Sequence, residues 1–442
     1  MIKNRIFGVL LRLKGSSPDR DYVRVQAALA QQGLLELCSS YLQQLLGHAY
    51  QNVPFYTRAL SSICRNDRVD LDRLDRISLL TKDDIRRSQK ELASKDICAR
   101  KWHYNTSGGS TGEPVRFIQD KMFDRWTNVT TKYYYHNMIG IDELAVKKVL
   151  LWGSERDIYT HTLDLRATIV NWLTNTTPLN SFRMTQRDME EYVRIINTHR
   201  PDLIRGYADS LYQISEFVSA RGLNIHSPRV MVSAAEKLDK KRRETIERVF
   251  GTRVYDFYGS REVDGIAGEC GRGMMHIFMF NNYIEVLPER VAPLKNSDIG
   301  RVIVTGLHNY SMPLIRYDVG DTAILGPANC GCGDPLPTLA AVTGRVSDHF
   351  LTRDGTLIHG EYFTHLFYFR DWVRSFQVIQ EDLTRVRVLA AVGEANQHEM
   401  NDISDKIRLV MGQECSVIWE IVEEIPNSPS GKHIYTKSLI SR

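Results

Sequence analysis

The sequence lacks a long apolar run, a strong excess of either charge and a regular cysteine framework. No run approaches the roughly 20 apolar residues that a membrane-spanning helix needs, and no secretory signal pattern is present. A formal net charge of +4 over 442 residues argues against a general nucleic-acid-binding surface. The seven cysteines are odd in number and mostly isolated, which fits a reducing compartment. We therefore expect a cytoplasmic protein without nucleic-acid partners.

What is present indicates a folded protein of more than one domain. The chain is 43% hydrophobic and 25% charged. Between about residues 145 and 305, short β-branched runs alternate with segments of helical periodicity, which predicts an α/β architecture with sheets flanked by helices. The predicted strands are 149–153, 203–206, 229–233, 254–258 and 301–305, and the predicted helices are 188–199, 210–221 and 237–250. A further antiparallel portion is expected at 281–289.

The two ends of the sequence differ from this middle region in their predicted secondary structure. Residues 20–100 are mainly helical in pattern, and Thr81, with Asp84 three residues on, marks a helix start. After about residue 345, a hairpin (373–380 and 385–392), a helix (394–411) and a strand (415–422) predict a compact α+β unit of normal domain size. We predict a large N-terminal domain over 1–344, with a helical lead-in over 1–100, and a small mobile C-terminal domain over 345–442.

Residues 1–14 combine apolar side chains with four basic ones. The basic residues are Lys3, Arg5, Arg12 and Lys14, and no acidic residue precedes Asp19. On a helical wheel the apolar side chains cover a broad arc. Two interpretations stay open: this helix packs on the body of the protein, or it makes a weak contact with an anionic membrane surface.

The segment 104–114 is rich in glycine and in hydroxyl side chains. Glycines let backbone N–H groups turn towards a polyphosphate, and hydroxyls add donors. The segment lacks the lysine of a mononucleotide P-loop and the G-x-G-x-x-G pattern of dinucleotide-binding folds. By itself it would also fit an ordinary turn. The candidate phosphate-binding residues are Thr106, Ser107, Gly108, Gly109, Ser110, Thr111 and Gly112.

Four further motifs follow this loop along the chain. They are YGSRE at 258–262, RYDVGD at 316–321, TGRVSD at 343–348 and SGK at 430–432. In order and spacing the five motifs resemble the acyl-adenylate-forming superfamily, and within it the phenylacetate–CoA ligases and their capsule-biosynthesis and coenzyme-synthetase-like relatives. The segments 52–56 and 80–84 look like that group too, so the resemblance runs from about residue 50 to the end.

The resemblance implies that the large domain holds ATP and Mg²⁺. By this resemblance, Glu262 would bind Mg²⁺, Tyr258 would stack on adenine, and Asp321 would accept hydrogen bonds from the ribose hydroxyls. A metal and a cation are needed because like charges about 4 Å apart repel by about 4 kcal/mol at an effective dielectric constant near 20. The other implied nucleotide contacts are Gly259, Ala235, Glu236 and Arg345.

The resemblance assigns the first chemical step to the small domain. Lys432 is the implied catalytic residue that reaches the α-phosphate and the substrate carboxylate, and Lys437 is a nearby lysine that must be distinguished from it. Asp348 matches the hinge about which the small domain would swing. The loop departs from many relatives because no lysine follows Pro114, although Arg116 lies two residues on.

Cys270, His276, Cys330 and Cys332 form a separate group of candidate metal ligands. Three thiolates and one imidazole suit tetrahedral Zn²⁺, and some members of the resembled group carry a structural zinc. Both halves flank the motifs described above, so the fold could bring them together. The alternative is a set of buried cysteines without a metal.

The resulting hypothesis is an ATP-dependent, AMP-forming acid ligase. It activates a small carboxylic acid to acyl-AMP, releases pyrophosphate and transfers the acyl group to CoA. An amide ligase acting on an amine of a sugar or amino acid in surface polysaccharide biosynthesis is the alternative, because no short motif distinguishes the two acceptors. A non-catalytic nucleotide-binding homologue is a second alternative, against which the presence of Glu262, Asp321 and Lys432 argues. Candidate residues of the acyl pocket are Trp152, Tyr207, Ala234 and Phe257.

Overall fold

The computed structural model describes residues 2–65, 68–106, 115–153, 165–288, 299–343, 350–358, 360–367, 370, 372–425 and 435–440. The chain divides into two compact units. Unit 1 contains the described residues up to 106, Val115–Ala145, and those from Tyr255 to 343. Unit 2 contains Val146–Val254 and the described residues from 350 onwards. Within these ranges, no helix has the length and apolarity to cross a bilayer.

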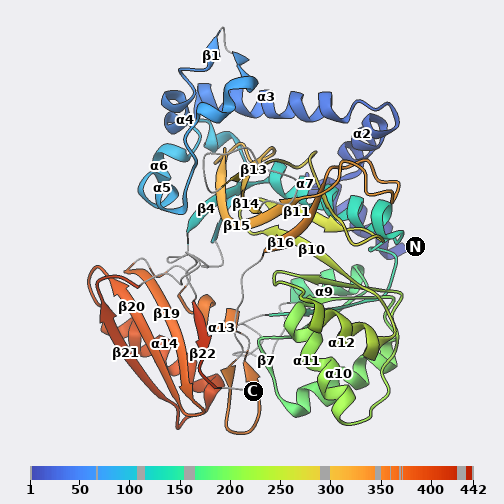
Figure 1. Cartoon of the computed structure of the whole chain (residues 1–442), viewed down its shortest axis with the longest axis vertical. Helices are drawn as coiled ribbons and strands as arrows, with labels where there is room; N and C mark the ends of the chain where they lie inside the picture. The colour runs from blue at the N-terminus through green and yellow to red at the C-terminus, as the bar shows by residue number, and fades with distance from the viewer. Residues whose placement is uncertain are drawn as a thin grey trace. The chain divides into compact units, whose positions relative to one another are not determined.

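Unit 1 begins with the predicted helical lead-in (Figure 1). Leu42, Leu45, Leu46 and Ala49 recur at helical spacing along its longest helix and are all buried. The helices are α1 (Ile2–Leu13), α2 (Asp19–Ala30), α3 (Leu34–Asn52), α4 (Pro54–Ala59), α5 (Lys82–Arg87), α6 (Gln89–Leu92) and α7 (Lys121–Tyr133), with the shorter helical segments η1 (Leu71–Arg76), η2 (Ile97–Ala99) and η3 (Tyr134–Ile139).

The sheet portion of unit 1 is antiparallel, in the order β13-β14-β15-β16-β12-β11-β10. The predicted strands at 254–258, 281–289 and 301–305 are confirmed as β10, β13 and β14. The strands of this unit are β1 (Cys64–Arg65), β2 (Arg68–Val69), β3 (Trp102–Thr106), β4 (Arg116–Asp120), β10 (Val254–Ser260), β11 (Asp264–Glu269), β12 (Met275–Ile277), β13 (Asn282–Pro288), β14 (Ile299–Gly306), β15 (Tyr317–Leu325) and β16 (Thr338–Thr343).

Unit 2 contains the predicted α/β layer. Its parallel strands have the order β9-β8-β5-β6, and their inward residues share one hydrophobic core with α10, α11 and α12, which lie together in Figure 1. The predicted start of α12 was three residues early, because Asp239 caps the helix. The elements are β5 (Lys148–Trp152), α9 (Leu165–Leu173), β6 (Thr176–Asn180), α10 (Gln186–His199), β8 (Leu203–Tyr207), α11 (Ala208–Ala220), β9 (Val230–Ala234) and α12 (Lys240–Phe250).

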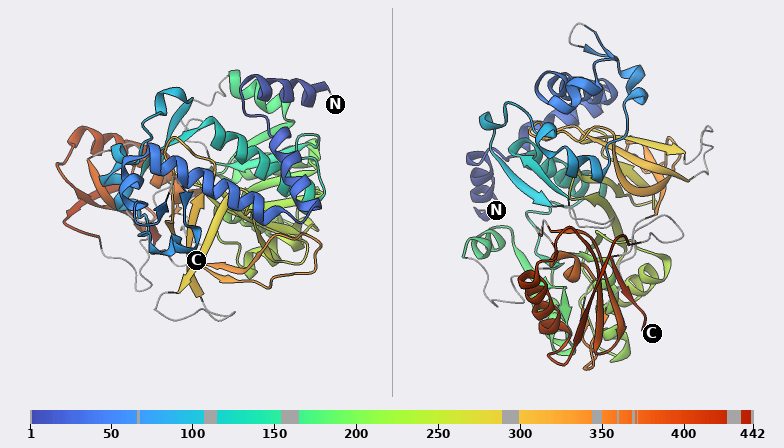
Figure 2. Two further views of the ribbon diagram at one scale, coloured as in Figure 1. Left: turned by 90° about the horizontal axis from the view of Figure 1, so that it is seen from above. Right: turned by 90° about the vertical axis from the view of Figure 1, so that its left-hand side faces the viewer.

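The C-terminal part of unit 2 forms a four-stranded sheet, β21-β20-β19-β22. α14 lies along this sheet (Figure 2, right), and the predicted hairpin, helix and strand are all confirmed. One core joins this part to Phe182 and Tyr207. The domain boundary at 344/345 stays a prediction. The remaining elements are β7 (Arg183–Met184), β17 (Phe350–Leu351), β18 (Leu357–Ile358), α13 (Gly360–His365), β19 (Val373–Asp382), β20 (Arg385–Val392), α14 (Gln397–Met411), β21 (Ser416–Val422) and β22 (Thr436–Ser438).

The core of unit 1 contains a buried histidine, from which we predict that the free energy of unfolding depends on pH. His308 stacks on Trp126 with ring centroids 3.7 Å apart, and its Nε2 donates to the carbonyl oxygen of Phe280 (2.8 Å). Burial lowers the pKa of His308 to about 3. Below pH 6.5 the unfolded chain binds a proton that the folded chain does not, so this group should reduce the free energy of unfolding by up to about 1.4 kcal/mol per pH unit as the pH falls towards 3.

His308→Gln keeps an N–H donor and removes the titration. We therefore expect the unfolding free energy of this variant, measured by urea denaturation between pH 4.5 and 7.5, to depend less steeply on pH than that of the wild type. Parallel pH profiles for the two proteins would contradict the assignment.

Candidate functional site

The end of β3 is hydrogen-bonded to the turn that carries Glu262. Thr106, the last residue of β3, is buried and lies opposite Arg116 in the β3–β4 pair. The preceding residue, Asn105, donates from Nδ2 to Oε1 of Gln119 (2.9 Å). The Nε2 of Gln119 in turn donates to the carbonyl oxygen of Arg261 (2.7 Å). The beginning of the predicted phosphate loop is thereby fixed next to the YGSRE motif.

The other loop residues and the C-terminal motifs fall outside the described ranges. Arg116, which follows the loop, places its guanidinium carbon 3.6 Å from the ring centroid of Tyr104, so it is held on β3 by a cation–π contact. The predicted residues outside the described part of the chain are Ser107, Gly108, Gly109, Ser110, Thr111, Gly112, Arg345, Asp348 and Lys432.

The structure brings two predicted nucleotide-binding residues together. The hydroxyl of Tyr258 donates to Oδ2 of Asp321 (3.0 Å), and Asp321 is buried. Gly259 follows at a bulge between β10 and β11, where a Cβ atom would lie 2.7 Å from the carbonyl oxygen of Asp264. Only glycine fits this close approach without a shift of the backbone. The predicted adenine and ribose contacts therefore share one corner of unit 1.

Glu262 is buried and has a cation beside it. Its side chain is 6% exposed, and Tyr317 donates a hydrogen bond to its Oε1 (3.0 Å). The Nζ of Lys82, itself 8% exposed, lies 3.8 Å from the same oxygen. A buried carboxylate needs hydrogen bonds and a counter-charge to remain ionised. The site thus contains an ammonium group that the sequence reasoning did not assign, because Lys82 is 180 positions from Glu262 in the chain and its motif indicated only a helix start.

Backbone pairing holds Lys82 in this position. The N–H of Leu80 donates to the carbonyl oxygen of Arg316 (2.9 Å), and the N–H of Asp318 donates to the carbonyl oxygen of Leu80 (3.0 Å). The predicted capping of the next helix is confirmed: Thr81 Oγ1 accepts from the N–H of Asp84 (3.2 Å), whose carboxylate accepts from the N–H of Thr81 (2.9 Å). The 80–84 segment is therefore fixed against the RYDVGD motif.

Arg316 has a backbone conformation that is unusual for a residue other than glycine. Its φ is +50°, in the left-handed region that side chains disfavour. Its buried guanidinium compensates by binding both carboxylate oxygens of Glu285 (3.0 and 2.9 Å) and by donating to the carbonyl oxygens of Asp75 and Ile77. Strain of this kind persists only where the surroundings hold it, as they do at this motif.

The predicted adenine-side segment lies in unit 2, at the end of β9. Ala235 has φ +68° and is exposed. The next residue, Glu236, accepts from the backbone N–H of Asp209 (3.0 Å), and Asp209 pairs with Arg242 (2.9 Å). Ala235 therefore lies at the carboxyl end of a parallel strand, where α/β sheets bind ligands. Its left-handed backbone conformation is strained, as is common at functional sites.

The candidate acyl-pocket residues are packed against other aromatic rings. In unit 1, Phe257 lies 5.1 Å from Tyr134 between ring centroids. In unit 2, Trp152 stacks on Tyr207 with centroids 4.3 Å apart, and Tyr207 is 1% exposed. Tyr207 and the buried Ala234 therefore contribute to packing in this structure.

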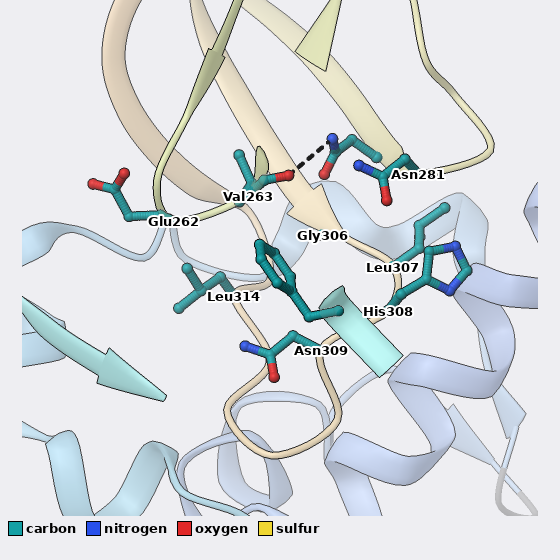
Figure 3. Close-up of a pocket in the computed structure, with 10 residues that line it drawn as sticks. Glu262, Val263, Asn281, Gly306, Leu307, His308, Asn309 and Leu314 are labelled. Carbon is teal, nitrogen blue, oxygen red and sulfur yellow. Dashed lines mark hydrogen bonds between the residues drawn. The ribbon is translucent and has the colours of Figure 1, made fainter. Parts of the chain in front are cut away.

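A small pocket adjoins Glu262 within unit 1 (Figure 3). The carboxylate of Glu262 and the imidazole of His308 lie on opposite sides of it. Asn282 donates to the carbonyl oxygen of Val263 (3.2 Å, dashed in Figure 3), and Asn309 donates to that of Met312 (3.0 Å). The Asn282 amide thus holds the backbone next to Glu262.

The four predicted metal ligands come together, which confirms that the fold unites the two halves. Their ligand atoms all lie within 4.8 Å of one another. His276 Nε2 is 3.1 Å from Cys330 Sγ and 3.3 Å from Cys332 Sγ, and Cys270 Sγ is 3.8 Å from Cys330 Sγ. This donor set has the composition of a closed, four-coordinate zinc site.

Neighbouring groups orient these side chains as metal ligands. His276 Nδ1 lies 2.9 Å from the carbonyl oxygen of Leu336. Because a carbonyl only accepts, Nδ1 carries the proton and the Nε2 lone pair faces the thiols. Backbone N–H groups of Arg272 and Asp334 point at Cys270 Sγ and Cys332 Sγ, each at 3.4 Å, so the backbone helps to orient both sulfur atoms.

Comparisons with known proteins found related sequences and a similar fold. The family model described as the CapK C-terminal domain matches residues 350–438. Protein CapK of Staphylococcus aureus is 23% identical over 414 residues, which cover 90% of this chain and 88% of that protein. Phenylacetate–coenzyme A ligase of Escherichia coli (strain K12) is 26% identical over 342 residues, covering 72% of this chain and 73% of that enzyme. A crystal structure of 2-hydroxyisobutyryl-CoA ligase with 2-HIB-AMP and CoA has the same fold, with a TM-score of 0.57 at 16% identity, covering 91% of this chain and 90% of that one.

From the contact between Lys82 and Glu262 we predict that substitutions at these two residues have coupled effects on the free energy of unfolding. Lys82→Met leaves a buried carboxylate without its cation, and we expect it to lower the free energy of unfolding by about 3 kcal/mol. Glu262→Gln in the same chain should recover most of that loss, because a neutral amide needs no counter-charge. Urea unfolding of the two single variants and the double variant measures the coupling. Lys90→Met, at an exposed lysine of α6, serves as the control, and additive losses would refute the pairing.

Proposed function

Because the chain belongs to the phenylacetate–CoA ligase-like and CapK branch of the acyl-adenylate-forming enzymes, we propose that it activates a small carboxylic acid with ATP and transfers the acyl group to CoA. The first step forms a bond from a carboxylate oxygen to the α-phosphorus and releases pyrophosphate. The observation that supports the proposal is the hydrogen-bonded corner of unit 1 in which Glu262, Asp321 and the end of β3, which precedes residues 107–114 in the chain, are fixed together.

In this proposal Glu262 holds Mg²⁺ and Asp321 holds the ribose. A carboxylate is the oxygen ligand that Mg²⁺ takes in nucleotide sites, and Glu262 is kept oriented by Tyr317 and Lys82. When bound, Mg²⁺ would neutralise phosphate charge and stabilise the charge that develops at phosphorus. Lys82 adds a cation beside Glu262 in a chain whose phosphate loop has no lysine after Pro114.

Lys432 is proposed to stabilise the transition state of the first step. It would bind the α-phosphate and the substrate carboxylate, as its motif implies by resemblance. Rotation of the small domain about Asp348 would then withdraw Lys432 and expose the acyl-AMP to the acceptor. The chain's own part in the second step is therefore to open the site rather than to supply a nucleophile.

CoA is the proposed acceptor because the curated relatives with a named activity are phenylacetate–coenzyme A ligases. The alternative acceptor is an amine. A panel of carboxylic acids, tested for ATP–pyrophosphate exchange, identifies the acid. Addition of CoA or of candidate amines, followed by the mass of the product, then identifies the acceptor. Absence of exchange with every acid, in protein shown to be folded, would count against the first step.

The assignment of Lys432 predicts a selective loss of the first half-reaction. We expect Lys432→Ala to reduce ATP–pyrophosphate exchange about 10²-fold or more, because a cation aimed at the developing charge is removed. Lys437→Ala is the matched control: this exposed lysine of β22 lies five residues away, and its removal should leave exchange near the wild-type rate. Undiminished exchange in Lys432→Ala, or an equal loss in both variants, would overturn the assignment.

We also propose that the Cys270, His276, Cys330 and Cys332 group holds a structural zinc ion. Protein purified without chelator should contain about one zinc per chain by elemental analysis. Cys332→Ser should lower both the zinc content and the thermal midpoint. Cys98→Ser, at an exposed cysteine outside the group, should change neither. Zinc-free protein with the same thermal midpoint before and after zinc addition would refute this proposal.

A further inference from the structure

The N-terminal helix α1 has an apolar stripe that the body of unit 1 does not cover. Ile6, Val9 and Leu13 are 44%, 51% and 79% exposed. Their spacing of three and four places them on one face of the helix. Phe7 and Leu11, by contrast, are partly buried. α1 is the dark blue helix at the N-terminus in Figure 2, left. Its apolar side chains therefore fall into a partly buried set and an exposed set.

Basic residues accompany this stripe, and acidic residues do not. Arg12 and Lys14 are exposed, and α1 has no acidic residue. The first acidic residue, Asp19, contacts two cations: Arg12 (3.1 Å) and Lys132 (3.0 Å). The local surface therefore combines exposed apolar side chains with an excess of positive charge.

This combination favours a lipid surface over a second protein chain. If two copies met through this face, their basic residues would lie together without acidic partners, which costs free energy. An anionic bilayer offers a partner for both kinds of side chain on the helix: the acyl boundary for the apolar side chains and negative headgroups for the cations. The packing alternative for residues 1–14 accounts for Phe7 and Leu11, but not for the exposed stripe.

We propose that α1 is an interfacial helix that docks this chain reversibly on an anionic bilayer surface. The exposed stripe of Ile6, Val9 and Leu13 enters the headgroup region, and the flanking basic side chains pair with anionic lipid. Three apolar side chains and a few charges give weak binding, so the chain would exchange between the surface and solution. The inference stands on the exposure and charge of α1 and does not depend on the proposed ligase activity.

Vesicle binding tests the proposal. The full-length chain is sedimented with phosphatidylcholine vesicles, and with the same vesicles containing about a third phosphatidylserine, at physiological and high salt. We expect binding to the anionic vesicles, with the partition coefficient falling about fivefold for Lys14→Gln, because one basic residue near such a surface contributes about a factor of five. The Val9→Glu, Leu13→Glu double variant should reduce binding further.

Leu35→Glu is the matched control, since Leu35 is 67% exposed on α3 of the same unit. It should bind as the wild type does. Thermal midpoints and ATP–pyrophosphate exchange, measured for every variant, separate loss of docking from loss of fold or activity. Three results would overturn the proposal: no binding to anionic vesicles, equal binding to both compositions, or a Val9→Glu, Leu13→Glu variant that changes only the oligomeric state.

Discussion

Burial of a carboxylate is the constraint around which unit 1 is organised. Glu262 could not remain ionised at 6% exposure without partners, and it has both a hydrogen bond from Tyr317 and the ammonium of Lys82. Each partner imposes a further requirement. Lys82 reaches this point only because Leu80 pairs with the backbone beside Tyr317. Contacts with this one carboxylate therefore join the helical lead-in, the β10–β11 turn and β15.

Three of the six residues other than glycine that have a positive φ in the described part of the chain lie at or beside the sequence motifs. Arg316, Asp264 and Ala235 are residues other than glycine with φ values of +50°, +60° and +68°, and all three lie in or next to segments that the resemblance assigns to nucleotide binding. Each such conformation costs about 1–3 kcal/mol and persists only where surrounding contacts hold it. For Arg316 those contacts are known: Glu285 and two carbonyl oxygens. At Arg316, strain that the fold maintains in this way supports a preformed arrangement of this part of unit 1.

What the sequence predicted well were features with a local signal. Strands such as β5 and β9 contain short apolar runs, and the capping box of Thr81 and Asp84 is a short pattern. β11 (DGIAGE) was missed because it is short and glycine-rich, and β12 was missed because it is short and follows the turn at Cys270. Lys82 was missed as a site residue for a different reason: its pairing with Glu262 depends on the folded path of the chain. The cysteine–histidine group was predicted because ligand chemistry, unlike pairing, can be recognised across a long separation.

The Cys270, His276, Cys330 and Cys332 group, which we propose to hold zinc, lies where it would brace the site rather than act in it. Its four donors are sufficient for a closed tetrahedral site, whereas catalytic zinc keeps one position open. Asp334, beside Cys332, accepts a hydrogen bond from Tyr133 at the end of α7 (2.8 Å), and Cys270 directly follows β11, the strand that leads back to the Glu262 turn. Anchoring the far end of β11 to α7 and β12 limits how far the turn at its near end can move. If the group holds zinc as proposed, the position of Glu262 would therefore depend in part on side chains that have no role in the proposed chemistry.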